Sequence, residues 1–254
     1  MSLNPSIVAI LQEARRIVAF HHSVGIASYP ATDGIKSLLT ASRPRPTAAA
    51  PPPNMRRAET APEPPPALTA TDSTLDAIRL DLGDCCRCDL AGGREKIVFG
   101  VGNSGAELFI VGECPDPDED HAGQPFQGEA GQLLDRMLAA IGLSRDQVYL
   151  TNIVKCRPTG NQCPLPPETK ACQPFLVRQI AVVAPKVICT MGPLASQSLL
   201  HSQQPLSRLR GRFHTFRGID LMPTFHPAFL LANPELKKAT WLDLQMIQKR
   251  CATP

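Results

Sequence analysis

The sequence predicts an α/β fold in which helices cover both faces of a central, mostly parallel, four-stranded sheet, giving three layers in the order α/β/α. Two observations carry this prediction. Four short apolar runs have the length of buried strands, and segments with apolar residues at helical spacing lie between them. Hydrophobic residues make up 43% of the 254-residue chain, which is enough to fill the core of one large domain.

Composition divides the chain into three parts. Residues 1–40 form an N-terminal helical segment, in which residues 4–21 carry apolar positions at helical spacing. Residues 41–72 are rich in proline and alanine and predict a disordered linker, because such a stretch buries too little apolar surface to offset chain entropy. Residues 73–254 form the folded domain. The N-terminal helix either packs on this domain or binds a partner protein, and both interpretations stay open at this point.

The elements of the domain follow in chain order. A short helix is predicted over residues 74–82, and it leads into Cys85. The four strands are predicted at residues 107–112, 148–154, 186–191 and 219–225. Apolar helix faces are predicted from Leu133 to Ile141 and from Phe175 to Val183, the second ended by Pro185. Strands that alternate with helices in this way predict a parallel sheet.

Net charge and cysteine content exclude several classes of protein. The net charge of +3 gives no strong global field for a polyanion, so a nucleic acid would have to bind at a local basic patch. The chain has no run of about eighteen uncharged apolar residues, so we expect no membrane span. Nine cysteines without a visible secretory signal favour metal binding or burial over disulfides. We therefore expect a cytoplasmic protein, and a monomer.

Polar residues follow three of the predicted strands. Glu113 comes directly after the first strand, Asn152 lies near the end of the second, and His226 follows the fourth. Because ligands of parallel α/β sheets bind beyond the carboxyl ends of the strands, we expect these side chains to converge on one site. For His226 and Asn152 the structural alternative is a loop or strand-end residue that is hydrogen-bonded to backbone.

Four cysteines have the spacing of a soft-metal site. Cys85 and Cys88 form a C-x2-C pair, and Cys156 and Cys172 follow far downstream. Thiolates in this arrangement suit zinc or an iron–sulfur cluster. Cys86 is adjacent to Cys85, but the C-x2-C spacing favours Cys85 as the ligand.

Several separated motifs show a resemblance to a known family. They are C-x2-C-x-L at residues 85–90, G-E-x-P, G-x-P-F and A-G-Q-L-L within residues 112–134, T-N-x-V-K-C-R-P at 151–158, C-x-P-F-L at 172–176 and H-P-A-x-L-L at 226–231. With these motifs, residues 84–248 resemble a family-4 uracil-DNA glycosylase, the iron–sulfur type. The resemblance implies the fold of that family, DNA containing uracil as the partner, and a 4Fe-4S cluster held by Cys85, Cys88, Cys156 and Cys172.

The resemblance also implies an enzyme that flips uracil out of DNA and hydrolyses its N-glycosidic bond with water, without a lysine nucleophile. His226 would donate a hydrogen bond to uracil O2 as negative charge develops there. Asn152 would bind O4 and N3–H of uracil, a pattern that cytosine does not match. The ring of Phe126 would stack on the flipped base, with core packing as its structural alternative.

Glu113, Glu119 and Asn161 are the remaining catalytic candidates. The resemblance implies that Glu113 shapes the pocket, that Glu119 orients His226 or the water, and that Asn161 positions water or sugar, unless it is a turn residue. Several residues depart from the family pattern: Cys114, in the substrate site, is larger than the usual glycine or alanine, and Asp116 replaces a glycine. Gln127 stands where an apolar residue is usual, and Gln162-Cys163 replaces the usual arginine-containing pair. These departures favour an alternative function, a DNA or damaged-base binding protein with weak or altered activity.

Arginines in the C-terminal part are the candidates for DNA contact. Arg208, Arg210 and Arg212 form a local basic cluster, and Lys155 and Arg157 flank the third of the paired cysteines. Such side chains bind phosphates without reading sequence, with a solvated charged face as the structural alternative. A third class of function, electron transfer or redox sensing by an iron–sulfur protein, would leave the predicted base site without a purpose.

Overall fold

The computed structural model describes residues 74–252, without the side chain of Asn161. The N-terminal segment 1–40 and the linker 41–72 lie outside the described residues, so the predictions about them stay predictions. The first described helix begins close to the predicted domain boundary at residue 73. No helix within the described part of the chain is long and apolar enough to cross a lipid bilayer.

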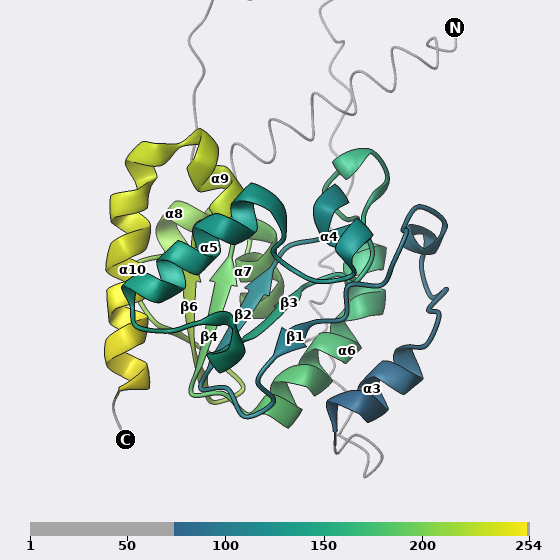
Figure 1. Ribbon diagram of the computed structural model, residues 1–254, viewed down its shortest axis with the longest axis horizontal. Coiled ribbons are helices and arrows are strands. Elements are labelled where there is room, and N and C mark those ends of the chain that lie inside the picture. Colours follow the sequence, from purple (N-terminus) through teal and green to yellow (C-terminus); the bar gives the residue numbers. More distant parts are fainter. Residues whose placement is uncertain (1–73, 253–254) are drawn as a thin grey trace, which may run out of the picture. The chain divides into compact units, whose positions relative to one another are not determined.

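A six-stranded sheet forms the centre of the domain (Figure 1). Its strands are β1 Val101–Gly102, β2 Leu108–Gly112, β3 Tyr149–Asn152, β4 Val187–Met191, β5 His214–Phe216 and β6 Ile219–Thr224. They lie in the order β1-β3-β2-β4-β6-β5, with four parallel inner strands and an antiparallel strand at each edge. The four predicted strands are confirmed as the parallel core, but the predicted count of four is wrong. Strands β1 and β5 are two and three residues long, too short to show a period in the sequence.

Helices cover both faces of the sheet, which confirms the predicted three layers. They are α3 Leu75–Leu82, α4 Pro117–Ala122, α5 Gly128–Ala140, α6 Pro166–Val183, α7 Pro193–Leu200, α8 Leu206–Leu209, α9 Pro227–Ala232 and α10 Lys237–Cys251. Side chains of β2 alternate between two core clusters, as the period of a strand requires. Leu108 and Ile110 belong to the cluster that includes residues of α5 and α10, whereas Phe109 and Val111 belong to the cluster that includes residues of α6 and α7.

The helix ends follow local sequence signals. Thr74 caps α3, because its Oγ1 accepts a hydrogen bond from the backbone N–H of Ala77 at 3.1 Å. The apolar face predicted from Leu133 lies on α5, and the face that ends at Val183 is the C-terminal half of α6. Helix α6 stops at Ala184, the residue before Pro185, as predicted from the missing N–H of proline.

Helix α4 is only six residues long and was not predicted, although its first residues carry a strong start signal. Asp116 is the N-cap: its Oδ1 accepts from the backbone N–H of Glu119 at 2.8 Å, and Glu119 Oε2 accepts from the N–H of Asp116 at 2.7 Å. The φ of Asp116 is −89°, an ordinary value for any residue. Asp116, which departs from the family pattern, therefore caps helix α4 and causes no backbone strain.

A buried ion pair joins the segment after α8 to helix α10. The carboxylate of Asp243 is fully buried, and its Oδ2 accepts from Arg210 Nε at 3.1 Å and from Arg210 Nη2 at 2.9 Å. The same oxygen accepts from Thr224 Oγ1 at 2.7 Å. Because Thr224 ends β6, this network fixes the strand that leads to His226.

Candidate active site

The carboxyl ends of the parallel strands bring the predicted polar residues together. Gly112 of β2 and Asn152 of β3 are direct partners in the sheet register. The chain segments after these strands stay paired, since Val154 N donates to the carbonyl of Glu113 at 3.3 Å. His226 follows β6, which lies two strands away from β2 in the sheet, and it is the N-cap of α9. The three residues thus follow the carboxyl ends of parallel strands, at the same edge of the sheet.

Asn152 presents an unpaired hydrogen-bond acceptor inside the domain. The side chain is only 1% exposed, and its Nδ2 donates to Glu119 Oε1 at 3.2 Å. Its Oδ1 is buried and has no hydrogen-bond partner. Because buried polar atoms are nearly always paired in folded proteins, an acceptor left open at a strand end points to a ligand that donates an N–H.

Glu119 holds Asn152 in this orientation. One carboxylate oxygen accepts from Asn152 Nδ2 and from the backbone N–H of Phe126, and the other accepts from the N–H of Asp116. Glu119 was predicted to orient His226 or a water, whereas its hydrogen bonds go to Asn152, Phe126 and Asp116. Burial raises the pKa of Glu119 to about 7, against the lowering effect of these N–H donors.

Phe126 and His226 form the aromatic side of the site. Their rings are stacked, with centroids 5.5 Å apart and an angle of 20° between the planes. Phe126 is 2% exposed and has a φ of +55°, a left-handed conformation that is unusual for a residue with a Cβ. Its N–H is held by Glu119 and its carbonyl accepts from Arg145 Nη2 at 2.5 Å, so both sides of the strained residue are fixed.

His226 is present as a neutral ring with a defined tautomer. Its Nδ1 accepts from the backbone N–H of Ala228 at 3.2 Å, so the proton of the neutral ring is on Nε2. Burial lowers the pKa of His226 to about 4, although part of its surface stays accessible. The side chain is therefore an uncharged N–H donor at neutral pH.

Glu113 lies against the start of α7. Its Oε1 accepts from the backbone N–H of Leu194 at 2.7 Å, and burial raises its pKa to about 7. Gly192 leaves the space for it, because a Cβ there would lie 2.5 Å from Glu113 Cδ. The neighbouring residue, Cys114, packs against the core cluster beside α6, and burial raises the pKa of its thiol well above the ordinary range. Cys114 is thus a neutral, mostly apolar group at this edge.

Asn161 is the last residue of the short 3-10 helix Thr159–Asn161. Its side chain is outside the described part of the structure. The predicted contact with water or sugar therefore stays a prediction.

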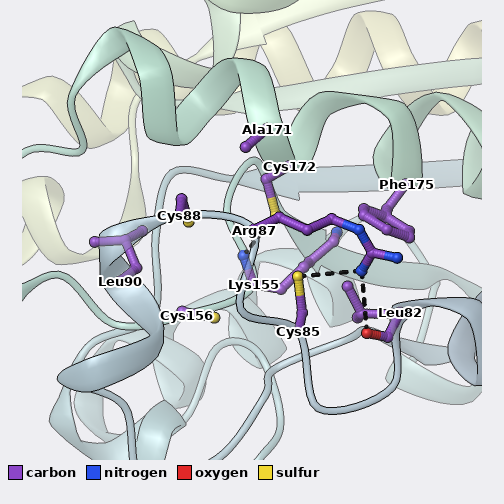
Figure 2. A pocket seen from close by; sticks show the side chains of 10 residues that line it. All are labelled: Leu82, Cys85, Arg87, Cys88, Leu90, Lys155, Cys156, Ala171, Cys172 and Phe175. Atoms are coloured by element: carbon purple, nitrogen blue, oxygen red, sulfur yellow. Dashed lines mark hydrogen bonds between the residues drawn. The ribbon is translucent and has the colours of Figure 1, made fainter.

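The four cysteines line a pocket that is formed by the segment after α3, the segment after β3 and helix α6 (Figure 2). Cys85, Cys88, Cys156 and Cys172 all contribute to its wall, and Figure 2 shows their sulfur atoms turned toward a common space. Cys86 is exposed and donates to the carbonyl of Asp84 at 3.4 Å. The placement of the two side chains therefore favours Cys85 over Cys86, as their spacing does.

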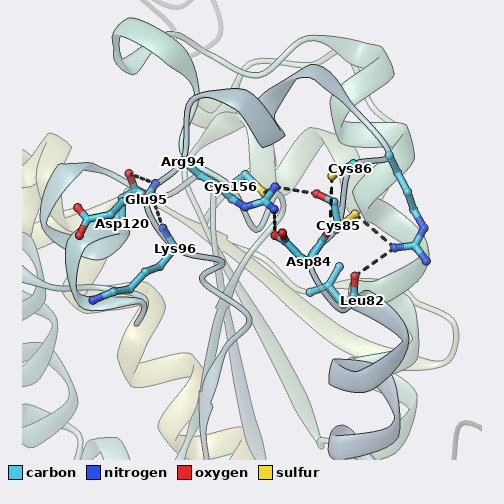
Figure 3. A network of polar contacts seen from close by, with 10 residues as sticks. Leu82, Asp84, Cys85, Cys86, Arg94, Glu95, Lys96, Asp120 and Cys156 are labelled. Carbon is cyan, nitrogen blue, oxygen red and sulfur yellow. Dashed lines mark hydrogen bonds and ion pairs between the residues drawn. The ribbon is translucent and has the colours of Figure 1, made fainter.

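N–H groups surround the sulfur atoms of this pocket. Arg94 Nη1 donates to Cys156 Sγ at 3.5 Å and to the carbonyl of Cys85 at 2.7 Å, as Figure 3 shows. Arg87 Nη1 lies 3.3 Å from Cys85 Sγ, and the backbone N–H of Lys155 lies 3.3 Å from Cys172 Sγ. Such donors stabilise thiolates and the negatively charged groups that thiolates bind.

The loop that carries Arg94 is fixed by Asp120 of α4. The carboxylate of Asp120 accepts from the N–H of Glu95 at 2.9 Å and of Lys96 at 3.1 Å (Figure 3). Arg157 also approaches Asp120, with 3.8 Å between Nη1 and Oδ2. Helix α4 therefore supports both sites: Glu119 faces Asn152, and Asp120 holds the loop at the cysteine pocket.

Comparison with known protein families shows the family to which the chain belongs. The model of the Uracil DNA glycosylase superfamily matches residues 99–245, which include the whole base site. The chain belongs to the uracil DNA glycosylase superfamily. The fold class predicted from its resemblance to that family is confirmed with it.

Individual relatives agree on the type within the superfamily. The chain is 38% identical to the type-4 uracil-DNA glycosylase of Archaeoglobus fulgidus over 186 residues, which are 70% of this chain and 94% of that protein. It is 39% identical to the type-4 enzyme of Saccharolobus solfataricus over 184 residues, 69% of this chain and 85% of that protein. It is 38% identical to the type-4 enzyme of Thermotoga maritima over 165 residues, 63% of this chain and 86% of that protein. The predicted family-4 membership is confirmed.

Three of the basic residues that were predicted to contact phosphates have partners within the domain. Arg210 is engaged by Asp243 and by the carbonyl of Ala239. Lys155 is buried, with 1% exposure, and Arg157 lies beside Asp120. The sequence shows a cluster of basic residues, but it does not show which of them forms an ion pair with a buried carboxylate.

Arg208 and Arg212 remain exposed on the segment around α8. They are the two exposed members of the predicted basic cluster, whereas Arg210 is half-buried. Arg94 and Asp120, which organise the cysteine pocket, were not predicted from the sequence, because their partners lie 62 and 25 residues away in the chain.

Replacing Gly112 with alanine tests how tightly the base site is built. A Cβ at this position would lie 2.2 Å from Asn152 Oδ1 and 2.9 Å from Phe126 Cζ. We expect the free energy of unfolding to fall by about 1–3 kcal/mol, because the added carbon overpacks the site. Urea unfolding would measure this change, with Gly105→Ala as the control, since the nearest atom to a Cβ there is 3.7 Å away. Equal free energies of unfolding for the two variants would show that the site rearranges to accommodate the extra carbon.

Proposed function

We propose that this chain is a monofunctional uracil-DNA glycosylase that flips uracil out of DNA, hydrolyses the bond between C1′ and N1 with water, and leaves an abasic site. One observation carries the choice of base. The buried Oδ1 of Asn152 lacks a donor, and uracil N3–H is a donor in the right place on the Watson–Crick edge. The second hydrogen of Asn152 Nδ2 is left for uracil O4. Cytosine would place the acceptor N3 against Oδ1 and would be rejected.

Bond cleavage leaves the electron pair of the C1′–N1 bond on the uracil ring, while an oxonium-like charge forms on the sugar. His226 Nε2–H is the donor for uracil O2, since Nδ1 is occupied by the N–H of Ala228. Phe126 provides the ring against which the base stacks. Asn161, by its place in the resemblance, is the proposed residue for the water that attacks C1′, and Glu113, fixed by the N–H of Leu194, is proposed to shape the pocket.

The cysteine pocket fits an iron–sulfur cluster better than a single metal ion. Among residues 74–252, no three His, Cys, Asp or Glu side chains are close enough together to hold one ion. A cluster places iron and sulfide between its ligands, so its four thiolates stand farther apart than those around zinc. Cys85, Cys88, Cys156 and Cys172 would hold a 4Fe-4S cluster, which would tie the loops after α3 and β3 to α6. No step of base release passes through it.

Arg208 and Arg212 are the proposed phosphate-binding residues. Exchanging both for glutamine is expected to weaken DNA binding and to reduce the slope of log K against log salt by about 0.9 for each phosphate that the variant no longer neutralises. Binding to a labelled duplex at several salt concentrations would measure the slope. An unchanged slope would show that neither side chain meets a phosphate.

Arg210→Met is the contrasting variant for this measurement. We expect it to lower the free energy of unfolding by about 3 kcal/mol, because Asp243 would be left buried without its partner. Where the protein still folds, its salt slope is expected to equal that of the wild type. A slope as low as that of the double glutamine variant would place Arg210 on the DNA.

The function is tested by release of uracil from a single-site oligonucleotide incubated with the purified full chain. Free uracil and an abasic strand are the expected products.

Tight binding without release would instead favour the damaged-base binding protein. That alternative rested on Cys114 and Asp116, which the structure explains as apolar packing and a helix cap. A reversible redox couple with no response to DNA would favour electron transfer. A cytoplasmic location, a monomeric state and a protein partner for the N-terminal segment stay predictions.

A further inference from the structure

Lys155 is a fully buried cation that the proposed mechanism does not use. Its Nζ donates to Thr151 Oγ1 at 2.5 Å and to the backbone carbonyl of Asn152 at 2.8 Å. Both acceptors are neutral, and no carboxylate among residues 74–252 forms an ion pair with this ammonium. A buried ammonium without a counter-charge is strongly disfavoured in a protein interior, and it otherwise loses its proton, so a protonated Lys155 needs a negatively charged partner elsewhere in the site.

The nearest source of negative charge is the cysteine pocket. Lys155 contributes to the wall of that pocket together with Cys85, Cys88, Cys156 and Cys172, as Figure 2 shows. Its backbone N–H donates to Cys172 Sγ at 3.3 Å, and the next residue in the chain is Cys156. An iron–sulfur cluster held by four thiolates carries a net negative charge. The counter-charge of Lys155 is thus present when the proposed cluster is bound.

The same ammonium reaches the residue that binds the base. Asn152 ends β3, and its carbonyl is one of the two acceptors of Lys155 Nζ. The other acceptor, Thr151 Oγ1, is itself anchored because it donates to the carbonyl of Phe99 at 2.8 Å. The Asn152 side chain continues the connection to Glu119. A continuous chain of contacts therefore runs from the cysteine pocket through Lys155 to the uracil-binding amide.

We propose that Lys155 is a positioning residue that connects the two sites: it balances the charge of the cluster and at the same time holds the Asn152 backbone in the geometry that binds uracil. This inference rests on the proposed function and on the proposed cluster. It assigns the cluster a part in base recognition through a residue of this chain, beyond tying loops together. Lys155 does not touch the substrate.

The test compares Lys155→Met with the wild type, both purified with their iron. Methionine keeps the length and apolar stem of lysine and removes the charge and the N–H donors. We expect a reduction potential lower than that of the wild type, because a positive charge beside the cluster is removed. We also expect kcat for uracil release to fall about 10–100-fold, the usual loss when a residue supporting a metal site is removed. Iron and sulfide per chain, and the thermal unfolding midpoint, would show that the variant is loaded and folded.

Two further variants separate the two parts of the inference. Arg94→Met removes another cation from the pocket, at Cys156 Sγ, but one without a contact to Asn152. It is expected to lower the potential, and its kcat is expected to fall less than that of Lys155→Met. Lys186→Met removes an exposed lysine that pairs with Glu107, and it is expected to change neither quantity.

The outcomes distinguish this inference from the proposed function. If the wild type releases no uracil, the proposed function fails. If the wild type is active and Lys155→Met keeps both its potential and its kcat, the inference is overturned. A shifted potential with wild-type kcat would also overturn it, since the link to Asn152 would be absent. If Lys155→Met does not fold, Lys155→Gln replaces it, because glutamine keeps an N–H donor without the charge. An unchanged potential in Lys155→Gln would overturn the inference.

Discussion

Replacing His226 with alanine is expected to lower kcat for uracil release about 10²–10³-fold while changing KM much less, the usual cost of losing one donor to a charge that develops in the transition state. The structure gives the physical reason. The ring is neutral and its single proton is on Nε2, because Nδ1 accepts from the N–H of Ala228. A donor of this kind bonds more strongly to uracil O2 as negative charge grows there than it does in the ground state.

The pH dependence of the same residue is a second part of this prediction. The pKa of His226 is lowered from 6.5 to about 4, so the fold favours the neutral ring. Its contribution to stability is present above pH 6.5 and is lost as the pH falls through 4. The tautomer that donates from Nε2 therefore persists at all pH values above about 5, and we expect no ionisation of His226 in the activity profile between pH 5 and 9.

Single-turnover release from a uracil-containing oligonucleotide would measure the loss in His226→Ala. His121→Ala is the matched control, because the His121 side chain is exposed and its ring pairs with Glu95 at the surface. A loss of less than about tenfold would show that uracil leaves without help from this donor. An activity step near pH 6.5 that disappears in the variant would show that the ring titrates in the accessible range, against the burial argument.

Local patterns predicted the parts of the fold that depend on single segments. The four inner strands are short apolar runs bounded by turn residues, and their side chains are buried on both faces except at the first two positions of β6. The strand ends then place Asn152 and His226 at one edge by topology alone. The edge strands β1 and β5 were not predicted, because segments of two or three residues show no hydrophobic period. The pairing of β1 also depends on β3, which lies far away in the chain.

Contacts between distant segments could not be predicted in the same way. The motif that contains Glu119 indicated a pocket residue, but its partner Asn152 lies 33 residues away and is reached only because α4 folds over the sheet edge. Arg208, Arg210 and Arg212 are alike in sequence, and burial of Asp243 on α10 separates Arg210 from the other two. Lys155 was predicted as a phosphate contact because it is basic and flanks Cys156, and the sequence shows neither its burial nor its acceptors.

Exchanging Glu119 for glutamine preserves the size of the side chain and is expected to disturb base recognition. The carboxylate accepts three N–H groups, from Asp116, Phe126 and Asn152, with one oxygen shared by the last two. Glutamine offers one oxygen and one NH2 group. Whichever way its amide turns, a donor then faces at least one of these N–H groups, at a cost of about 1–3 kcal/mol in the free energy of unfolding.

The two orientations of the new amide have different consequences. If the NH2 group faces Asp116, the side chain of residue 119 no longer accepts from the N–H of Asp116, while Asp116 Oδ1 still caps α4 and Asn152 keeps its orientation. If it faces Asn152, the Asn152 amide is driven to rotate and to turn its NH2 group toward the base. That rotation would place a donor against uracil N3–H and match the acceptor N3 of cytosine. We therefore expect kcat/KM for uracil to fall by at least about tenfold, with discrimination against cytosine reduced.

The pH profile assigns this effect to the carboxylate. The pKa of Glu119 is raised from 4.5 to about 7, so its contribution to stability is present below pH 4.5 and is lost as the pH rises through 7. The ionised form accepts all three N–H groups, whereas the protonated form turns one oxygen into a donor. We expect kcat/KM of the wild type to rise with pH through about 7, and Glu119→Gln to lack this rise.

Competition between uracil-containing and cytosine-containing strands, measured from pH 5 to 9, would test both expectations, with Glu129→Gln on the exposed face of α5 as the control. Burial also raises the pKa of Glu113 to about 7, so the rise has two candidate carboxylates. If the rise persists in Glu119→Gln, it belongs to Glu113. If discrimination and rate both equal those of the wild type, Asn152 is held by its backbone alone. Lys155, which binds the Asn152 carbonyl, would then be the residue that sets its geometry.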